Sequence, residues 1–72
     1  MMTIDEAKLY LDNEIKHVSD DGRNKLYIMN LYIDESIGNV VEIITRYLNN
    51  KQISVDVHKC NVRNSFELVI WW

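Results

Sequence analysis

Apolar residues recur with two different periods along this chain, and the order of those periods constrains the fold more than any other feature. Segments 4–18 and about 37–49 repeat apolar residues every three to four positions, which is typical of helices with one buried face. Segments 25–33, 53–58 and 66–72 alternate apolar and polar residues or are apolar throughout, which is typical of strands. The sequence therefore predicts a single domain with the element order α-β-α-β-β.

The first helix has a recognisable start and end. Thr3 and Glu6 are three residues apart and can cap its first turn reciprocally. Gly22 lies in the polar stretch 19–24, where a positive φ would close a turn. Leu9 falls on the polar side of the helix, so we expect an exposed apolar residue there. The expected buried stripe is Ile4, Ala7, Leu11, Ile15 and Val18.

The second helix is expected to follow Asp34, Glu35 and Ser36, because acids and capping residues suit the positive end of a helix. Asn49 or Asn50 can close it in the left-handed conformation. The expected buried face is Ile37, Val40, Val41, Ile44, Tyr47 and Leu48.

These elements predict an α+β fold. A right-handed crossover joins the first two strands, and the third, most apolar strand is expected between them, which gives a three-stranded mixed sheet in the order 1-3-2. Both helices can then cover one face. The opposite face would carry either Leu26, Ile28 and Tyr32 or their odd-numbered neighbours, and Trp71 more readily than Trp72. Large apolar residues left open on a sheet suggest an interface, so we expect homodimerisation there. The candidate interface residues are Ile28, Tyr32, Val69 and Trp71.

A chain of 72 residues has little core. Domains of this size bury only about 60% of the surface that the unfolded chain exposes. Cys60 is the only cysteine, so an internal disulfide is excluded and self-association is the expected support. A lone cysteine without a targeting segment fits a reducing cytoplasm, and no apolar run reaches the roughly 18 residues of a membrane span. We therefore expect a cytoplasmic protein.

Residue types suited to catalysis are present, but their spacing is unsuitable. Asp56, His58 and Cys60 alternate along one strand and would project to the same side. Neighbours two apart on a strand lie about 6.6 Å from each other, longer than the roughly 3 Å contact of a nucleophile with its base. No second cysteine or third histidine completes a metal shell. His17 suits the negative end of the first helix. We expect no enzyme activity, no cofactor and no metal.

Charge is distributed unevenly along the chain. Residues 1–35 carry eight acids and four bases, a net charge of −4, and residues 36–72 carry three acids and four bases, a net charge of +1. A charged partner of the first half should be basic, and direct nucleic-acid binding is disfavoured because it needs clustered Lys and Arg. The alternative is an ordinary solvated surface, since bases lie beside some of the acids. The candidate partner-binding residues are Asp5, Leu9, Asp12, Glu14, Asp20, Asp21, Asp34 and Glu35.

In composition the chain resembles the small early host-takeover proteins of lytic phages that infect low-GC bacteria: it is acidic, rich in Ile, Asn and Tyr, and free of proline. Several such proteins are inhibitors that mimic DNA and occupy the basic nucleic-acid site of a host protein. The resemblance implies our first hypothesis, a homodimeric inhibitor in the host cytoplasm whose acidic surface blocks a basic DNA-binding host protein. The second hypothesis is a protein-interaction module, antitoxin-like or an assembly subunit, that acts through Trp71, Val69 and the apolar sheet face.

Overall fold

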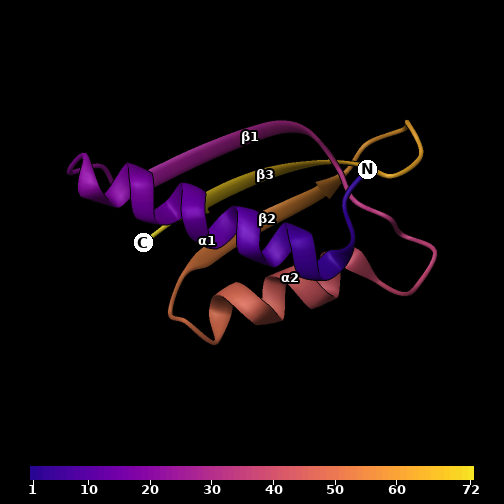
Figure 1. Ribbon diagram of the computed structural model, residues 1–72, viewed down its shortest axis with the longest axis horizontal. Coiled ribbons are helices and arrows are strands. Elements are labelled where there is room, and N and C mark those ends of the chain that lie inside the picture. Colours follow the sequence, from indigo (N-terminus) through magenta and orange to yellow (C-terminus); the bar gives the residue numbers. More distant parts are fainter.

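The computed structural model describes all of residues 1–72 and contains the five elements in the predicted order (Figure 1). The strands form one sheet in the order β1-β3-β2. The α+β class, the number of strands and their order are therefore confirmed. The elements are α1 (Ile4–Asp20), β1 (Lys25–Tyr32), α2 (Val40–Asn49), β2 (Ser54–Lys59) and β3 (Ser65–Trp71).

Both strand pairings in the sheet are antiparallel. β3 follows β2 through the short loop 60–64, so the two strands form a hairpin. The crossover through α2 makes β1 and β2 parallel to each other, but β3 lies between them and they do not pair. The predicted mixed sheet is thus corrected to an antiparallel one, because its two parallel strands are not neighbours.

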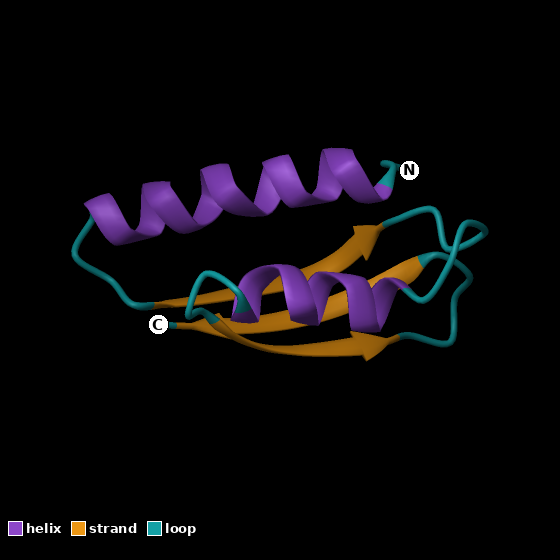
Figure 2. Cartoon of the chain, turned by 90° about the horizontal axis from the view of Figure 1, so that it is seen from below, coloured by secondary structure: helices purple, strands orange, loops and turns teal.

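Both helices lie on the same side of the sheet (Figure 2). α1 crosses above the strands, and α2 lies along β2 at the margin of the sheet (Figures 1 and 2). Their buried residues form one apolar cluster with the inner face of the sheet, where Phe66, Leu68 and Ile70 of the central strand are almost fully buried. No element covers the opposite face of the sheet (Figure 2).

The ends of α1 follow the sequence prediction. Thr3 and Glu6 form the capping box, in which each side chain accepts the backbone N–H of the other residue. After the helix, Gly22 has a φ of 82°, and the N–H of Arg23 donates to the carbonyl of Val18. This pattern satisfies carbonyls of the last turn, which the helix itself leaves unpaired. Neither helix of the chain has the length and apolar character needed to cross a membrane.

α2 begins later than predicted. Asn39 is its N-cap, and its side chain accepts the backbone N–H of Glu42. The side chain of Asp34 instead accepts the N–H and hydroxyl of Ser36 in a turn ahead of the helix. Ile37 was predicted on the buried face but lies before the cap, and it is 72% exposed.

α2 ends like α1, with a residue of positive φ after the helix, but this residue is not the one predicted. Gln52 has a φ of 63°, and the N–H of Ile53 donates to the carbonyl of Leu48. The prediction of Asn49 or Asn50 in the left-handed conformation was wrong, because the helical turns continue until Gln52 reverses the chain.

β1 contains a bulge at Met29 and Asn30. Ile28 pairs with Leu68 and Leu31 pairs with Phe66, so two residues of β1 lie opposite one residue of β3. Asn30 adopts a φ of 56° within the bulge. The extra residue reverses the alternation of side chains, so that even-numbered residues face the core before the bulge and odd-numbered residues face it afterwards.

The bulge corrects one predicted interface residue. Ile28 is 8% exposed and belongs to the core, whereas Tyr27 points to the opposite face of the sheet. Beyond the bulge Leu31 faces the core, and Tyr32 lies on the same outer face as Tyr27. In the sequence both faces of this segment look apolar, because the buried residues are the even-numbered ones before the bulge and the odd-numbered ones after it.

Candidate functional site

The sheet face that no helix covers, called the open face below, is the candidate site. The pairing register arranges its residues in rows across the three strands. The first row is Lys25, Trp71 and Ser54, the second is Tyr27, Val69 and Asp56, and the third holds the β1 bulge, Glu67 and His58, with Tyr32 beyond it on β1.

Aromatic side chains are exposed on the open face. Tyr27 is 58% exposed, Tyr32 46% and Trp71 41%, and Val69 is half-buried among them. Three of the four predicted interface residues therefore lie on this face, and their role in a dimer stays a prediction. Trp72 points to the other side of the sheet and packs against the core, as strand alternation predicts.

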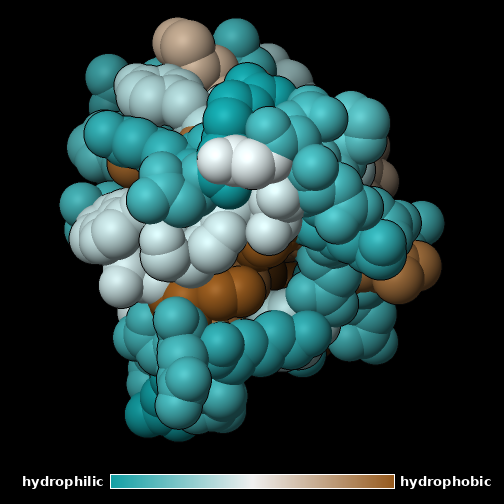
Figure 3. Space-filling view, turned by 90° about the vertical axis from the view of Figure 1, so that its left-hand side faces the viewer, coloured by the Kyte–Doolittle hydropathy of each residue, from teal (hydrophilic) through white to brown (hydrophobic).

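Two hollows border the tryptophans at the end of β3. One encloses about 390 Å³ beside Lys25, Val69 and Trp71. The other encloses about 670 Å³ between α1, the turn after α2 and Trp72. Figure 3 views this end of the molecule and shows apolar atoms inside a hollow that hydrophilic residues surround. Sequence reasoning missed both hollows, because segments far apart in the chain form their walls.

The acids singled out in the sequence do not gather on one surface. Asp20 and Asp21 lie at the end of α1, whereas Asp34 and Glu35 follow β1 at the other end of a molecule 35 Å long (Figure 1). Most of them are also paired within the chain. Ion pairs of 3.1 to 3.9 Å join Asp5 to Lys8, Asp12 to Lys51, Asp20 to Lys16, Asp21 to Arg23 and Glu35 to Lys59.

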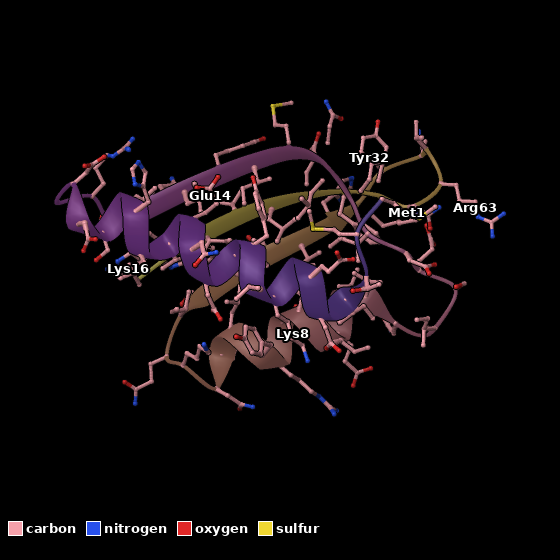
Figure 4. The ribbon with its side chains drawn as sticks, in the orientation of Figure 1. Met1, Lys8, Glu14, Lys16, Tyr32 and Arg63 are labelled. Carbon is pink, nitrogen blue, oxygen red and sulfur yellow. The ribbon has the colours of Figure 1, made fainter.

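The exposed surface of α1 carries both signs of charge. Figure 4 shows Lys8, Glu14 and Lys16 extending from this helix. Burial raises the pKa of the Tyr10 hydroxyl, and a hydrogen bond with Glu14 adds to the effect. Leu9 is 63% exposed, as its position on the polar side predicts. The helix therefore presents a mixed surface and not an uninterrupted row of carboxylates.

Asp12 joins the two helices. Its carboxylate accepts the hydroxyl of Tyr47 and forms an ion pair of 3.1 Å with Lys51. The ammonium groups of Lys51 and Lys8 lie 4.6 and 5.2 Å from the centre of the Tyr47 ring. Hydrogen bonds with Tyr47 and Asp12 raise the pKa of Lys51. These contacts give Asp12 a structural role between α1 and α2, which is not the free carboxylate that the sequence suggested.

Glu35 has a comparable role at the other end of the molecule. Its carboxylate accepts the backbone N–H of Asn64, and the side chain of Asn64 accepts the N–H of Glu35. Lys59 lies 3.2 Å from the same carboxylate. The hydrogen bond from Asn64 and then the bond from Lys59 hold the pKa of Glu35 below its ordinary value. The residue thereby ties the loop after β1 to the loop between β2 and β3.

The charged groups of the open face, by contrast, form no ion pairs within the chain. Six of the eight Lys and Arg side chains form ion pairs, and the two that do not are Lys25 and Arg63. Asp56 and Glu67 likewise have no basic side chain within 4 Å. Free charges of both signs therefore lie on the same face as the exposed aromatic side chains.

The residues considered for chemistry do not form a cluster. Asp56 and His58 lie on the open face, and Cys60 follows β2, where its N–H donates to the carbonyl of Ser65. His17 is exposed on the last turns of α1. No three His, Cys, Asp or Glu side chains of the chain are arranged so that they could hold a metal ion.

No protein-family model, curated protein or solved structure matches this chain.

Proposed function

We propose that this protein is a non-enzymatic binding module that contacts another protein through the open face of its sheet. The observation that carries the proposal is the combination, on one uncovered face, of three exposed aromatic side chains with the unpaired charges of Lys25, Asp56 and Glu67. A cytoplasmic place of action, which the single cysteine favours, belongs to the same proposal.

The chemistry of this face suits protein recognition. Trp71, Tyr27 and Tyr32 bring rigid rings with little conformational entropy to lose, and Trp and Tyr are over-represented among residues that dominate binding energy. Asp56 lies on β2 at the margin of the sheet, next to this apolar part. An apolar centre with a polar margin is the usual composition of a protein interface.

The test is capture of partners from a bacterial lysate by the wild-type chain and by Trp71→Ser. We expect the specific partner to be lost with Trp71→Ser and retained with Leu9→Ser, a matched change at an exposed apolar residue of α1. Circular dichroism of both variants checks that they remain folded. Capture that is unchanged in Trp71→Ser and lost in Leu9→Ser would refute binding through the open face.

The second candidate is the DNA-mimic inhibitor, in which the acids of α1 and its following turn block a basic site on a host DNA-binding protein. It is favoured by the exposure of Asp5, Asp20 and Asp21 along one 17-residue helix and its end. Their ion pairs lie at the surface, where such pairs are weak and a stronger basic partner can displace them.

Salt distinguishes the two candidates. Binding by exposed carboxylates should weaken steeply as ionic strength rises, because counterions screen the charges. Binding through Trp71 and its neighbours should weaken much less, since burial of apolar surface drives most of it. A partner that is still held at high salt, and is lost in Trp71→Ser, therefore supports the open face and counts against mimicry.

A further inference from the structure

We propose that the partner of the open face is a second copy of this chain, related by a two-fold axis that passes over Tyr27 and Val69 and brings Lys25 of each copy to Glu67 of the other. This inference rests on the proposed use of the open face for protein binding. It adds the identity of the occupant and the arrangement of the two copies.

The order of the rows makes the open face self-complementary. The row of Tyr27 and Val69 lies between the row that holds Lys25 and the row that holds Glu67. Each outer row is two residues, about 6.6 Å, from the middle one along the strands. This middle row, which is apolar on β1 and β3 and carries Asp56 on β2, therefore separates a positive group on one side from a negative group on the other at equal distances.

Consider two copies stacked with their open faces together and a two-fold axis that runs perpendicular to the strands, above the middle row. This axis places the Lys25 row of each copy opposite the Glu67 row of the other. The interface is then isologous, so every contact occurs twice. Lys25 of one copy then faces the β1 bulge of the other, one strand spacing of about 4.8 Å to the side of Glu67, and its long side chain can reach that carboxylate. Tyr27 and Val69 meet their own counterparts near the axis, where an interface needs apolar side chains. Asp56 also meets its counterpart, but on the exposed edge strand β2, where water screens the two carboxylates.

The charge pattern disfavours the other simple stacking of two such faces. An axis parallel to the central strand would set Glu67 against Glu67 in the middle of the interface. Like charges in direct opposition are repulsive, and a buried carboxylate without a base is costly. Lys25 has no internal ion pair to break before it can reach across.

The size of the face sets the strength of the association. Three strands about 4.8 Å apart and some seven residues of about 3.3 Å give a footprint of roughly 300 Å², below the roughly 800 Å² that each partner buries in a standard interface. The dimer should therefore be weak and should dissociate on dilution.

The experiment is sedimentation velocity of the purified chain from micromolar to millimolar concentration, for the wild type, Lys25→Glu, Glu67→Lys and the double exchange. Each single change replaces two attractive pairs by two repulsive ones, and we expect it to raise the dimer Kd by about tenfold. The double exchange restores opposite charges and should return the Kd to the wild-type value. Arg63→Glu is the control, because Arg63 is the other unpaired base and extends into solvent from the loop before β3 (Figure 4).

The outcomes separate this inference from the function it rests on. A chain that stays monomeric throughout overturns the second copy as occupant, whereas Trp71-dependent capture of a different protein would still uphold binding through the open face. A dimer that tolerates both single changes, or that the double exchange fails to rescue, also overturns the proposed arrangement. A dimer Kd about tenfold higher in both single variants, with rescue in the double and no change in Arg63→Glu, supports it.

Discussion

At the scale of single residues, Asp12 shows how a surface acid is drawn into the structure. In the sequence it stands on a helix with Lys8 and Lys16 nearby, but its partners in the fold are Tyr47 and Lys51. Its side chain is 32% exposed, so water screens the interaction only partly. A carboxylate held in this way is a poor candidate for contact with a partner, because binding would have to break both contacts.

Removing the hydroxyl of Tyr47 should therefore destabilise the fold. We expect Tyr47→Phe to lower the free energy of unfolding by about 1 kcal/mol, less than the roughly 1.5–3 kcal/mol of a hydrogen bond to a charged group because water partly screens this one. Tyr32→Phe is the matched control, because the hydroxyl of Tyr32 makes no hydrogen bond within the chain. Urea unfolding of both variants measures the difference. Equal stability of the two would show that the Tyr47 hydroxyl contributes nothing.

Glu35 predicts a pH dependence whose sign follows from its pKa. The folded state holds this pKa below its ordinary value, through Asn64 first and Lys59 second. The stabilisation is therefore fully present above the ordinary pKa of a glutamate and is lost as the pH falls through the lowered folded value. We expect Glu35→Gln to be less stable than the wild type at neutral pH and to approach it in acid. Parallel pH profiles of the two proteins would contradict this role.

At the scale of elements, the bulge in β1 determines what the open face contains. It turns Tyr32 to the same side as Tyr27 although the two are five residues apart, an odd spacing that a regular strand would place on opposite faces. Without the extra residue, either Leu31 or Ile28 would leave the core. The conformation of Asn30 thus supports both the core and the candidate site.

Substitutions at Asn30 test whether its positive φ maintains the bulge. Glycine adopts this conformation freely, whereas a β-branched residue there is strained by about 1–2 kcal/mol. We expect Asn30→Gly to be as stable as the wild type or more stable, and Asn30→Val to lose roughly that amount in urea unfolding. If both variants matched the wild type, the backbone at this position would not be under the constraint described.

Sequence reasoning predicted the elements better than their details, because periodicity and capping are local properties. Thr3 with Glu6 fixed the start of α1, and the alternation at the chain end placed Trp71 and Trp72 on opposite sides. The bulge could not be predicted, since the even-numbered and the odd-numbered residues of segment 25–33 are both largely apolar. Only the pairing with β3 determines which of them face the core. The pairing of Asp12 with Lys51 spans 39 positions, so no local pattern signals it.

At the scale of the whole molecule, the exposed surface bears on the need for a partner. The length of the chain led us to expect self-association as a support for folding. The folded chain of 8.6 kDa exposes 4700 Å². A compact monomer of this mass is expected to expose about the same area, roughly 4700 Å². The exposed area of the single chain therefore equals that of a compact monomer of its size and gives no sign that folding requires a second copy.

Urea unfolding can therefore test whether the folded chain forms the proposed dimer. A dimer that forms from folded monomers stabilises them by mass action, so the urea midpoint of the wild type should rise with protein concentration. The midpoint of Lys25→Glu should rise only at about tenfold higher concentration. At high dilution the two proteins should unfold alike, because Lys25 is exposed and makes no ion pair within the chain. Circular dichroism at several concentrations measures this directly. If Lys25→Glu proved unfolded wherever it is monomeric, the fold would depend on the second copy, as the short length of the chain alone suggests.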